Sequence, residues 1–275
     1  MGWQGEPRAT AAAAPPGRAR TVDPVETFPE RHRAVPGRPD AGRPSGDSEQ
    51  AIPVDAPLPS VPLPRAPGRL RELVRSSVDL PGRPIELVRP RAAMEALYEQ
   101  NFDAYEEFPP YWAELWPSSV ALARAVTAAR PVGARVLELG CGLGLPSIAA
   151  AAAGAHVLAT DRSPDALGFV AYNADRNGVS VEVEVCSWAQ PDPVVSRAPW
   201  DLVLAADVLY LHRGLADLDA LLPRLVDGTG EVWLADPGRP PAAAFLESAG
   251  RWAGVSEDRS DDPGVTVHRL RARDR

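Results

Sequence analysis

Two different patterns of hydrophobic and polar residues divide the chain near residue 69. In the first 68 residues, apolar side chains recur with neither the helical nor the strand period, and prolines interrupt the short apolar stretches. Downstream, apolar runs of strand length alternate with longer stretches that have helical spacing. Such alternation predicts an α/β fold, in which a mainly parallel sheet is covered by helices on both faces.

The predicted elements follow one another closely from residue 69 onward. Two short strands and two helices come first: strands over 71–74 and 84–88 around the Pro81-Gly82 turn, then helices over 91–102 and 118–129. Strands and helices alternate after that. The strands are predicted over 136–139, 156–160, 181–186, 201–206, 230–235 and 265–270. The helices are predicted over 145–153, 164–177, 215–225 and 241–251. A sheet of this kind binds ligands beyond the carboxyl ends of its strands.

The first 68 residues have the composition of a disordered or extended segment. They contain 14 of the 31 prolines, and their eight acidic residues balance their eight arginines. Proline cannot donate a hydrogen bond to a strand ladder, which argues against a sheet here. We interpret residues 1–68 as a Pro-rich, disordered N-terminal extension and residues 69–275 as the folded domain. A linker is the simplest role for the extension; a docking arm and a later translation start are the alternatives.

Composition excludes several classes of protein. A net charge of −8 and a pI of about 5.1 argue against a protein that coats nucleic acid. All 29 basic residues are arginine, and the two cysteines exclude a disulfide scaffold or a Cys-rich zinc site. The four histidines lack the spacing of metal ligands. No apolar run approaches the roughly 20 residues that cross a bilayer, and the N-terminus lacks a signal-peptide layout. We expect a cytoplasmic enzyme without a metal or a membrane, an organellar transit peptide being the minor alternative.

The strongest local motif is a glycine loop, Val136-Leu-Glu-Leu-Gly-Cys-Gly-Leu-Gly144, between a predicted strand and a predicted helix. Glycines there let the backbone bend sharply and let a ligand approach the main chain. The free N–H groups at the helix start would face that ligand. Asp161 follows Gly140 by twenty-one residues, at the end of the next strand, where a carboxylate can accept both hydroxyls of a ribose. The ligand is therefore predicted to contain a nucleoside.

Two residues distinguish this loop from a dinucleotide-binding loop. The dinucleotide fingerprint requires a third glycine where Leu145 stands. The carboxylate of Glu138 would also lie next to the negative charges of a pyrophosphate. A carboxylate there suits a cation instead, such as the amino group of S-adenosylmethionine. We therefore predict S-adenosyl-L-methionine as the cofactor and keep a nicotinamide oxidoreductase as a remote alternative.

Several motifs resemble those of the seven-β-strand class I methyltransferases. They are the glycine loop, Ala159-Thr-Asp161, and the run from Asp201 to Tyr210. More narrowly, Pro110-Tyr-Trp-Ala-Glu-Leu-Trp-Pro-Ser-Ser119 and Asp207-Val-Leu-Tyr210 resemble the lysine-methyltransferase-like group. The resemblance covers about residues 77–270. It implies a Rossmann-like sheet of seven strands, mainly parallel with the last strand antiparallel, and S-adenosylmethionine-dependent methyl transfer.

The resemblance also implies which residues bind the cofactor. Glu138 would bind its amino group, Gly140 and Gly142 would face its methionine part, and Asp161 would hold its ribose. Ser187 stands where many class I enzymes carry an acidic residue beside the adenine. The cofactor-binding set is Trp116, Glu138, Gly140, Cys141, Gly142, Gly144, Asp161, Ser187, Trp188 and Ala206. Within it, the Cys141 side chain is interpreted as a small space-filler, because no histidine neighbours it in sequence.

Asp207 and Tyr210 are the predicted catalytic residues, since they follow a buried strand at its carboxyl end and would line the methyl-transfer site. Tyr111 and Trp112 are the predicted substrate-binding residues. Aromatic faces favour a cation such as a sulfonium, which supports a cofactor contact for Trp116. The alternatives are that Asp207 caps a helix and that the aromatic side chains belong to the core. A carboxylate stabilises a charged amine, so Asp207 is interpreted as an orienting group and not as a strong base.

The resemblance to the lysine-methyltransferase-like group thus implies a methyltransferase that acts on a protein lysine and, as in that family, a monomer. Amide and adenine-amine methyltransferases usually carry Asn-Pro-Pro-Tyr after the fourth strand, and Ala206-Asp-Val-Leu fills that place here. The acidic balance also argues against an RNA substrate. A small-molecule amine acceptor and a catalytically silent, cofactor-binding interaction protein are the two alternatives.

Overall fold

A computed structural model describes residues 49–51, 72–91, 111–210, 214–260, 262 and 264–273. All of them belong to one compact unit, Gly42–Arg275. The helix predicted over 91–102 lies outside the described residues, apart from Arg91. The described helices include none that is long and apolar enough to cross a membrane.

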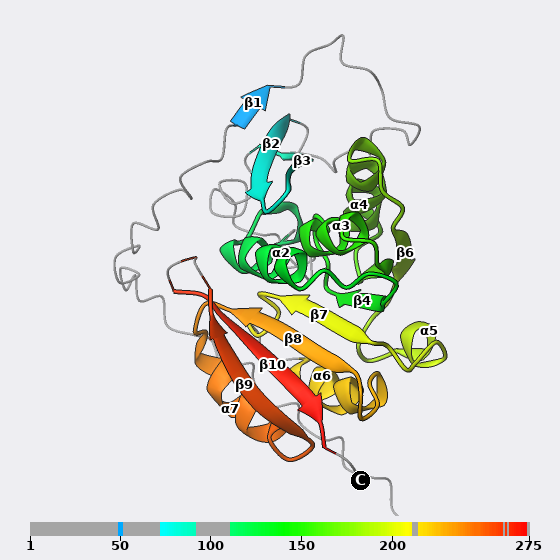
Figure 1. Ribbon diagram of the computed structural model, residues 1–275, viewed down its shortest axis with the longest axis vertical. Helices are drawn as coiled ribbons and strands as arrows, with labels where there is room; N and C mark the ends of the chain where they lie inside the picture. Colours follow the sequence, from blue (N-terminus) through cyan, green and yellow to red (C-terminus); the bar gives the residue numbers. More distant parts are fainter. Residues whose placement is uncertain are drawn as a thin grey trace, which may run out of the picture. The chain divides into compact units, whose positions relative to one another are not determined.

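The centre of the fold is a seven-stranded sheet in the described part of the chain, with the order β6-β5-β4-β7-β8-β10-β9 (Figure 1). Neighbouring strands from β6 to β8 run parallel, and β10 runs antiparallel to both β8 and β9. The strands are β4 (Arg135–Leu139), β5 (His156–Asp161), β6 (Glu182–Val185), β7 (Leu202–Ala206), β8 (Glu231–Asp236), β9 (Ala253–Arg259) and β10 (Thr266–Ala272). The predicted α/β class, seven strands and antiparallel last strand are confirmed.

Helices cover both faces of this sheet (Figure 1). The first face carries α2 (Pro117–Ala129), α3 (Leu145–Ala152) and α4 (Pro164–Arg176). The remaining helices, which lie toward the other face or the sheet's end, are α5 (Asp192–Val195), α6 (Leu215–Leu221), η2 (Leu222–Arg224) and α7 (Pro240–Ala249). The helix predicted over 215–225 is therefore divided into an α-helix and a 3₁₀ turn that contains Pro223, which has no N–H to donate.

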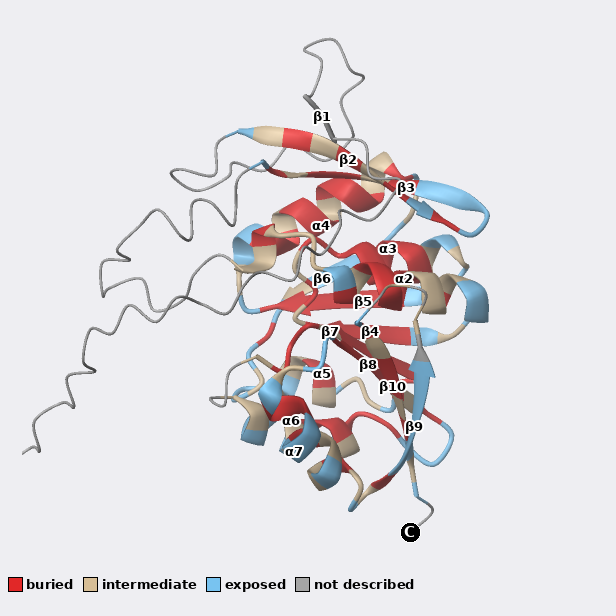
Figure 2. Cartoon of the chain, turned by 90° about the vertical axis from the view of Figure 1, so that its left-hand side faces the viewer, coloured by how far each residue is buried: buried red, intermediate tan, exposed pale blue. Residues whose placement is uncertain are grey.

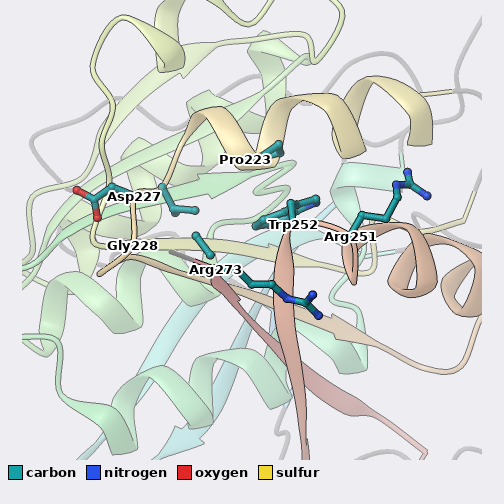
Figure 3. A pocket seen from close by; sticks show the side chains of 8 residues that line it. Pro223, Asp227, Gly228, Arg251, Trp252 and Arg273 are labelled. Atoms are coloured by element: carbon teal, nitrogen blue, oxygen red, sulfur yellow. The ribbon is translucent and has the colours of Figure 1, made fainter. Parts of the chain in front are cut away.

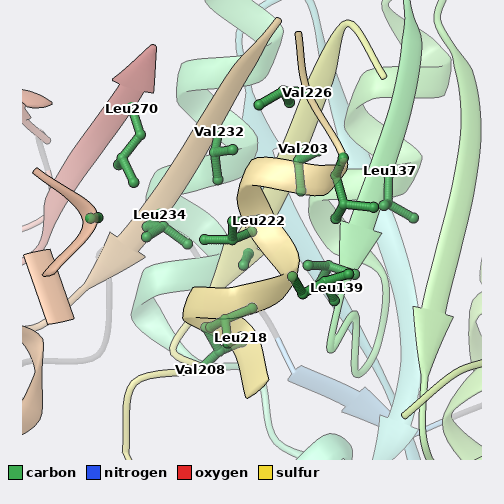
Figure 4. Packing of buried hydrophobic residues seen from close by; sticks show 14 of the residues in the cluster. Leu137, Leu139, Val203, Val208, Leu218, Leu222, Val226, Val232, Leu234 and Leu270 are labelled. Carbon is green, nitrogen blue, oxygen red and sulfur yellow. The ribbon is translucent and has the colours of Figure 1, made fainter. Parts of the chain in front are cut away.

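Alternate residues of the central strands enter two different cores. Leu137 and Val203 pack against Leu218 of α6, whereas Val136 and Leu202 pack against α2. Successive side chains of a strand point to opposite faces of the sheet, so a strand buried on both faces is apolar throughout. Figure 4 shows the first of these cores between the strands and α6. Figure 2 shows the buried residues concentrated on the strands and on the inner helix faces.

A separate three-stranded sheet packs on α4. Its strands are β1 (Glu49–Ala51), β2 (Leu73–Leu80) and β3 (Arg83–Pro90), all paired antiparallel. Asn173 of α4 and Asn177, the C-cap of that helix, bind the β3 edge of this sheet. Asn173 accepts a hydrogen bond from Val88 N (2.8 Å) and donates one to Val88 O (3.2 Å). Asn177 makes the same pair with Glu86 N (3.0 Å) and Glu86 O (2.7 Å). The hairpin at Pro81-Gly82 is as predicted, with longer strands, and Glu49–Ala51 pairs with β2 although it falls within the segment predicted to be an extension.

Strand β9 was not predicted from the sequence. The first residue of the strand, Ala253, is buried, but the residues from Gly254 to Asp258 are exposed. The strand lies at the edge of the sheet, where β10 is its one partner among the described strands. An exposed edge strand needs no apolar alternation, so the pattern from which strands are predicted is missing.

Candidate active site

The glycine loop joins β4 to α3 with a backbone that few other residues could adopt. Gly140, Gly142 and Gly144 have φ values of 64°, 52° and 76°. A Cβ atom at Gly144 would lie 2.8 Å from two methyl carbons of Val170 on α4, and one at Gly142 would lie 3.1 Å from Trp112 O. The loop therefore packs closely against its surroundings, and its glycines are required by both conformation and space.

Asp161, the last residue of β5, binds this loop. Its Oδ2 atom accepts a hydrogen bond from Gly142 N (3.1 Å), and its Oδ1 atom accepts one from Ser163 N (2.9 Å). Burial raises the pKa of the carboxyl group above its usual value, and the two backbone N–H groups partly offset this. The predicted neighbours, Asp161 and the glycine loop, are thus brought together at the carboxyl ends of β4 and β5.

Glu138 is held by the first turn of α3. Its Oε2 atom accepts hydrogen bonds from the backbone N–H (2.9 Å) and the hydroxyl of Ser147. The residue is only 1% exposed, and this burial raises the pKa of its carboxyl group to about 8. Glu138 therefore stabilises the helix start, and its predicted contact with the amino group of a cofactor stays a prediction.

Three predicted side chains, Tyr111, Trp116 and Tyr210, form one aromatic group. The rings of Tyr111 and Tyr210 meet edge to face, with centroids 5.4 Å apart, and the rings of Tyr111 and Trp116 are 6.4 Å apart. Trp116, at the N-cap of α2, donates a hydrogen bond from Nε1 to Tyr111 O (2.9 Å). Tyr111 begins the 3₁₀ helix η1 (Tyr111–Ala113). The aromatic group therefore joins the start of α2 to the turn after β7.

Trp112 lies elsewhere. Its ring stacks at a tilt on Phe169 of α4, with centroids 5.4 Å apart, in the cluster that also contains Val88 and Leu143. The structure therefore does not bring Trp112 to the aromatic group, although its backbone oxygen lies near Gly142. Its predicted contact with a substrate gains no support from this position.

The remaining predicted cofactor residues differ in their surroundings. Trp188 lies beside Gly140, whose added Cβ would be 3.7 Å from the indole Cζ2 atom. Ser187 is exposed, and Ala206 is half-buried at the end of β7. Cys141 is buried among apolar residues, and burial raises the pKa of its thiol well above the ordinary value. An unreactive space-filling thiol is what the sequence predicted at this position.

Asp207 follows β7 and makes an ion pair with Arg239. Its backbone adopts a φ of 57°, a left-handed conformation in which aspartate is more common than most residues. The carboxylate Oδ1 accepts a hydrogen bond from Nε of Arg239 and is ion-paired with its Nη2, and Oδ2 accepts a hydrogen bond from the Ser118 hydroxyl (3.3 Å). Burial raises the pKa of Asp207 above its usual value, and the guanidinium of Arg239 opposes this shift.

Arg239 is a residue of this site that the sequence interpretation missed. It lies at the start of α7 in the run Asp236-Pro-Gly-Arg239, where Asp236 Oδ1 accepts hydrogen bonds from Gly238 N (2.7 Å) and Arg239 N (2.8 Å). Its guanidinium carbon lies 5.7 Å from the ring centroid of Trp116 and 5.9 Å from that of Tyr210. The signal was present, because this run directly follows a buried strand, as Asp207 does.

All these groups gather at the carboxyl ends of β4, β5, β7 and β8, the edge at which such sheets bind ligands. A surface pocket that includes Asp227, Trp252 and Arg273 lies elsewhere (Figure 3). Its residues precede β8 and β9 or follow β10, so it belongs to the opposite edge of the sheet. Among the described residues, no group of three or more His, Cys, Asp or Glu side chains could hold a metal ion.

Known proteins share this sequence pattern and fold. Residues 112–247 match a family model described as lysine methyltransferase. The electron transfer flavoprotein beta subunit lysine methyltransferase of Xenopus laevis is 29% identical over 194 residues, which cover 66% of this chain and 75% of that protein. Protein N-lysine methyltransferase METTL21A of Danio rerio is 34% identical over 130 residues, which cover 45% of this chain and 59% of that protein. The chain therefore spans about six tenths of the length of METTL21A.

A solved structure shows the same fold at low sequence identity. It is the 16S rRNA methyltransferase RsmC of Thermus thermophilus, in complex with AdoMet and guanosine. The TM-score is 0.53 at 15% identity, and the match covers 72% of this chain and 50% of that chain.

The sheet order, the glycine loop and these likenesses define a class I methyltransferase with S-adenosyl-L-methionine as its cofactor. The predicted class of enzyme and the predicted cofactor are confirmed. Within that class, residues 112–247 match the lysine methyltransferase family model, and the two relatives above are named lysine methyltransferases.

Proposed function

We propose that this protein transfers a methyl group from S-adenosylmethionine to the side-chain amine of a lysine in a protein. The observation that carries the proposal is that the aromatic group and Arg239 gather beyond the carboxyl ends of β7 and β8. Strand β7 is the neighbour of β4, whose carboxyl end carries the glycine loop. The family match and the names of the relatives support lysine as the acceptor.

The residues around the glycine loop fit the cofactor. Each Asp161 oxygen accepts one backbone hydrogen bond, and a carboxylate oxygen has a second lone pair with which it could accept a ribose hydroxyl. Gly140 and Gly142 would leave the main chain open to the methionine part. Ser187 and Trp188 would flank the adenine, and Cys141, Gly144 and Ala206 would complete the wall. When bound, the cofactor supplies a methyl group activated by its sulfonium.

The aromatic group and its neighbours would orient the acceptor. Methyl transfer requires the attacking nitrogen to be held about 3–3.5 Å from the methyl carbon, in line with the leaving group. The rings of Tyr111 and Trp116 offer apolar faces for the four-carbon stem of a lysine. Burial raises the pKa of Tyr210 above its usual value, so its phenol stays protonated at neutral pH. Tyr210 would therefore position the amine through a neutral hydroxyl, and would not act as a phenolate base.

We further propose that the protein acts in the cytoplasm as a monomer with no nucleic-acid partner. Its net charge of −8 supports the last point, since affinity for a phosphate backbone depends on a basic surface. Light scattering of the purified chain tests the oligomeric state. We expect a mass of 29.3 kDa, and twice that mass would contradict the monomer.

The test of the proposed function uses methyl-labelled S-adenosylmethionine. The first acceptor is purified electron transfer flavoprotein β-subunit, the substrate named for the frog relative. A parallel reaction contains free lysine, and mass spectrometry locates the label. We expect label on a protein lysine. Label on the free amine alone would favour the small-molecule alternative, and cofactor binding without any transfer would favour the silent protein. The chain contains no lysine of its own, so lysine self-methylation cannot imitate a positive result.

A further inference from the structure

The Asp207–Arg239 ion pair has an inner and an outer member. The Asp207 side chain is 4% exposed and that of Arg239 is 30% exposed. Ser118, which donates to the far carboxylate oxygen, is fully buried behind Asp207. The guanidinium is therefore the end of the pair that a substrate can reach, and it is also the end that lies near the rings of Trp116 and Tyr210.

The strand order places this guanidinium on the acceptor side of the site. The glycine loop follows β4 and Asp161 ends β5, whereas Asp207 follows β7 and Arg239 follows β8. In the sheet the order of these strands is β5-β4-β7-β8, so Arg239 follows the strand farthest from β5. The guanidinium of Arg239 would therefore contact the methyl acceptor, which binds beside the cofactor.

We propose that Arg239 is the charged group that faces the acceptor amine and keeps it uncharged, and that Asp207 is a positioning residue that holds Arg239 in place. This inference rests on the proposed function, because it requires an amine acceptor. It differs from the sequence-based interpretation, in which Asp207 itself orients the acceptor.

The physical reason is the sign of the nearest charge. A lysine amine has an ordinary pKa of about 10.4, so at pH 8 only about one amine in 250 is neutral and able to attack a methyl group. A nearby cation disfavours the ammonium form, and a nearby carboxylate favours it. The pair as a whole is neutral, but Coulomb energy falls with distance, so its outer member has the greater effect on the acceptor.

Other charges near this pair are fixed by their own contacts. Asp236 lies behind Arg239, and its Oδ1 atom is bound to two backbone N–H groups at the start of α7. Asp161 and Arg162 carry opposite charges, and their effects on Tyr210 oppose each other. Burial raises the pKa of Tyr210, so its phenol carries no charge at neutral pH. Arg239 is therefore the cation of this region whose removal changes the balance of charge around an acceptor.

The experiment compares the pH dependence of kcat, which reports groups in the enzyme–substrate complex, in four variants. The electron transfer flavoprotein β-subunit is the acceptor, held at saturating concentration, and rates are measured between pH 6.5 and 10. In Arg239→Gln, we expect the acid limb of the profile to move up by at least one pH unit, because the carboxylate of Asp207 is left without its cation. Arg239→Lys keeps the charge, so its limb should move by less than half a unit. Asp207→Asn should leave the limb at or below its wild-type position.

Two controls separate this role from a merely structural one. Arg251→Gln removes an exposed arginine at the opposite edge of the sheet and should not move the limb. Calorimetric titration with S-adenosylhomocysteine should give affinities within threefold of wild type in all variants, since none of the altered residues binds the cofactor in this proposal.

Three results would overturn the inference while the proposed function stands. They are an unchanged limb in Arg239→Gln, a limb that rises by a full unit in Arg239→Lys or Asp207→Asn, and an Arg239→Gln variant that binds the cofactor but stays inactive up to pH 10. If Arg239→Gln does not fold, the profiles of Arg239→Lys and Asp207→Asn test the inference instead. A wild-type chain that methylates no protein lysine would overturn the proposed function and this inference together.

Discussion

Asp161 accepts a hydrogen bond from the backbone N–H of Gly142 (3.1 Å), and this one bond links the carboxyl ends of two neighbouring parallel strands. The carboxylate therefore shapes the glycine loop before any ligand is present. A residue with both roles should be sensitive to removal of its charge and of its oxygen atoms.

Replacement of Asp161 by alanine is expected to weaken cofactor binding at least tenfold. The variant loses the ribose acceptor, the bond from Gly142 that shapes the loop and the bond from Ser163 at the start of α4. Each hydrogen bond to a charged group stabilises by about 1.5–3 kcal/mol. Calorimetry with S-adenosylhomocysteine, well below the melting temperature, measures the loss. Asp165→Ala removes an exposed carboxylate from the first turn of α4 and serves as the matched control. Wild-type affinity in Asp161→Ala would contradict the assignment.

Replacement of Tyr210 by phenylalanine should spare binding and impair turnover. The ring contact with Tyr111 remains, while the hydroxyl that would position the amine is lost. We expect cofactor affinity within threefold of wild type and a kcat at least tenfold lower. Tyr172→Phe, in the cluster under the β2–β3 hairpin, is the comparison and should retain its kcat. An equal loss of cofactor binding in Asp161→Ala and Tyr210→Phe would refute the division of roles between them.

The stability of the fold should fall as pH rises from 5 to 8. Burial raises the pKa of Glu138 from 4.5 to about 8, so in this interval the folded chain keeps a proton that the unfolded chain releases. Its contribution is present below pH 4.5 and is lost as the pH approaches 8, with a slope of at most about 1.4 kcal/mol per pH unit. Urea denaturation at pH 5, 6.5 and 8 measures this. Glu138→Gln should flatten the dependence, leaving the part due to Asp161 and Asp207, whose pKa values are also raised. An equally steep dependence in that variant would show that Glu138 is not the source.

Asn173→Ala should destabilise the fold by about 2–4 kcal/mol. It leaves the N–H and C=O of Val88 without their partners in a buried place, and each such group costs about 1–3 kcal/mol. Urea denaturation gives the free energy of unfolding. Asp79→Ala, at an exposed position on β2, is the control and should change it by less than about 0.5 kcal/mol. A loss below 1 kcal/mol in Asn173→Ala would mean that water replaces the amide.

Deletion of residues 1–68 is expected to leave the melting temperature within about 2 °C of the full chain. For a domain of 150–250 residues, a change of 1 kcal/mol shifts the melting temperature by about 2–4 °C. The deletion removes β1, three residues long, whose side of β2 would then be solvated. A decrease of several degrees, measured by scanning calorimetry, would place part of this segment in the folded core.

The sequence predicted the central sheet well, because buried parallel strands are apolar on both faces and are followed here by glycines or charged residues. Strand β9 was not predicted because its exposed residues carry no apolar pattern. Arg239 was not predicted as a site residue because Asp236-Pro-Gly-Arg239 has the composition of a simple turn. Tyr111 and Trp112 could not be told apart, since a 3₁₀ helix turns about a third of a circle per residue and only the structure shows which ring faces the site.

The asparagine pair at the C-terminal end of α4, Asn173 and its C-cap Asn177, has a consequence for how this molecule contacts other chains. A sheet's outer strand ordinarily offers a row of unpaired peptide groups that a second chain can extend. On β3, the outward groups of Glu86 and Val88 are already bound by Asn177 and Asn173. A foreign strand would have to displace four hydrogen bonds to add itself there. The asparagine side chains thus take the place of a neighbouring strand along β3. They prevent another chain from extending the sheet at this edge, whether in a fibre or by exchange of hairpins between copies.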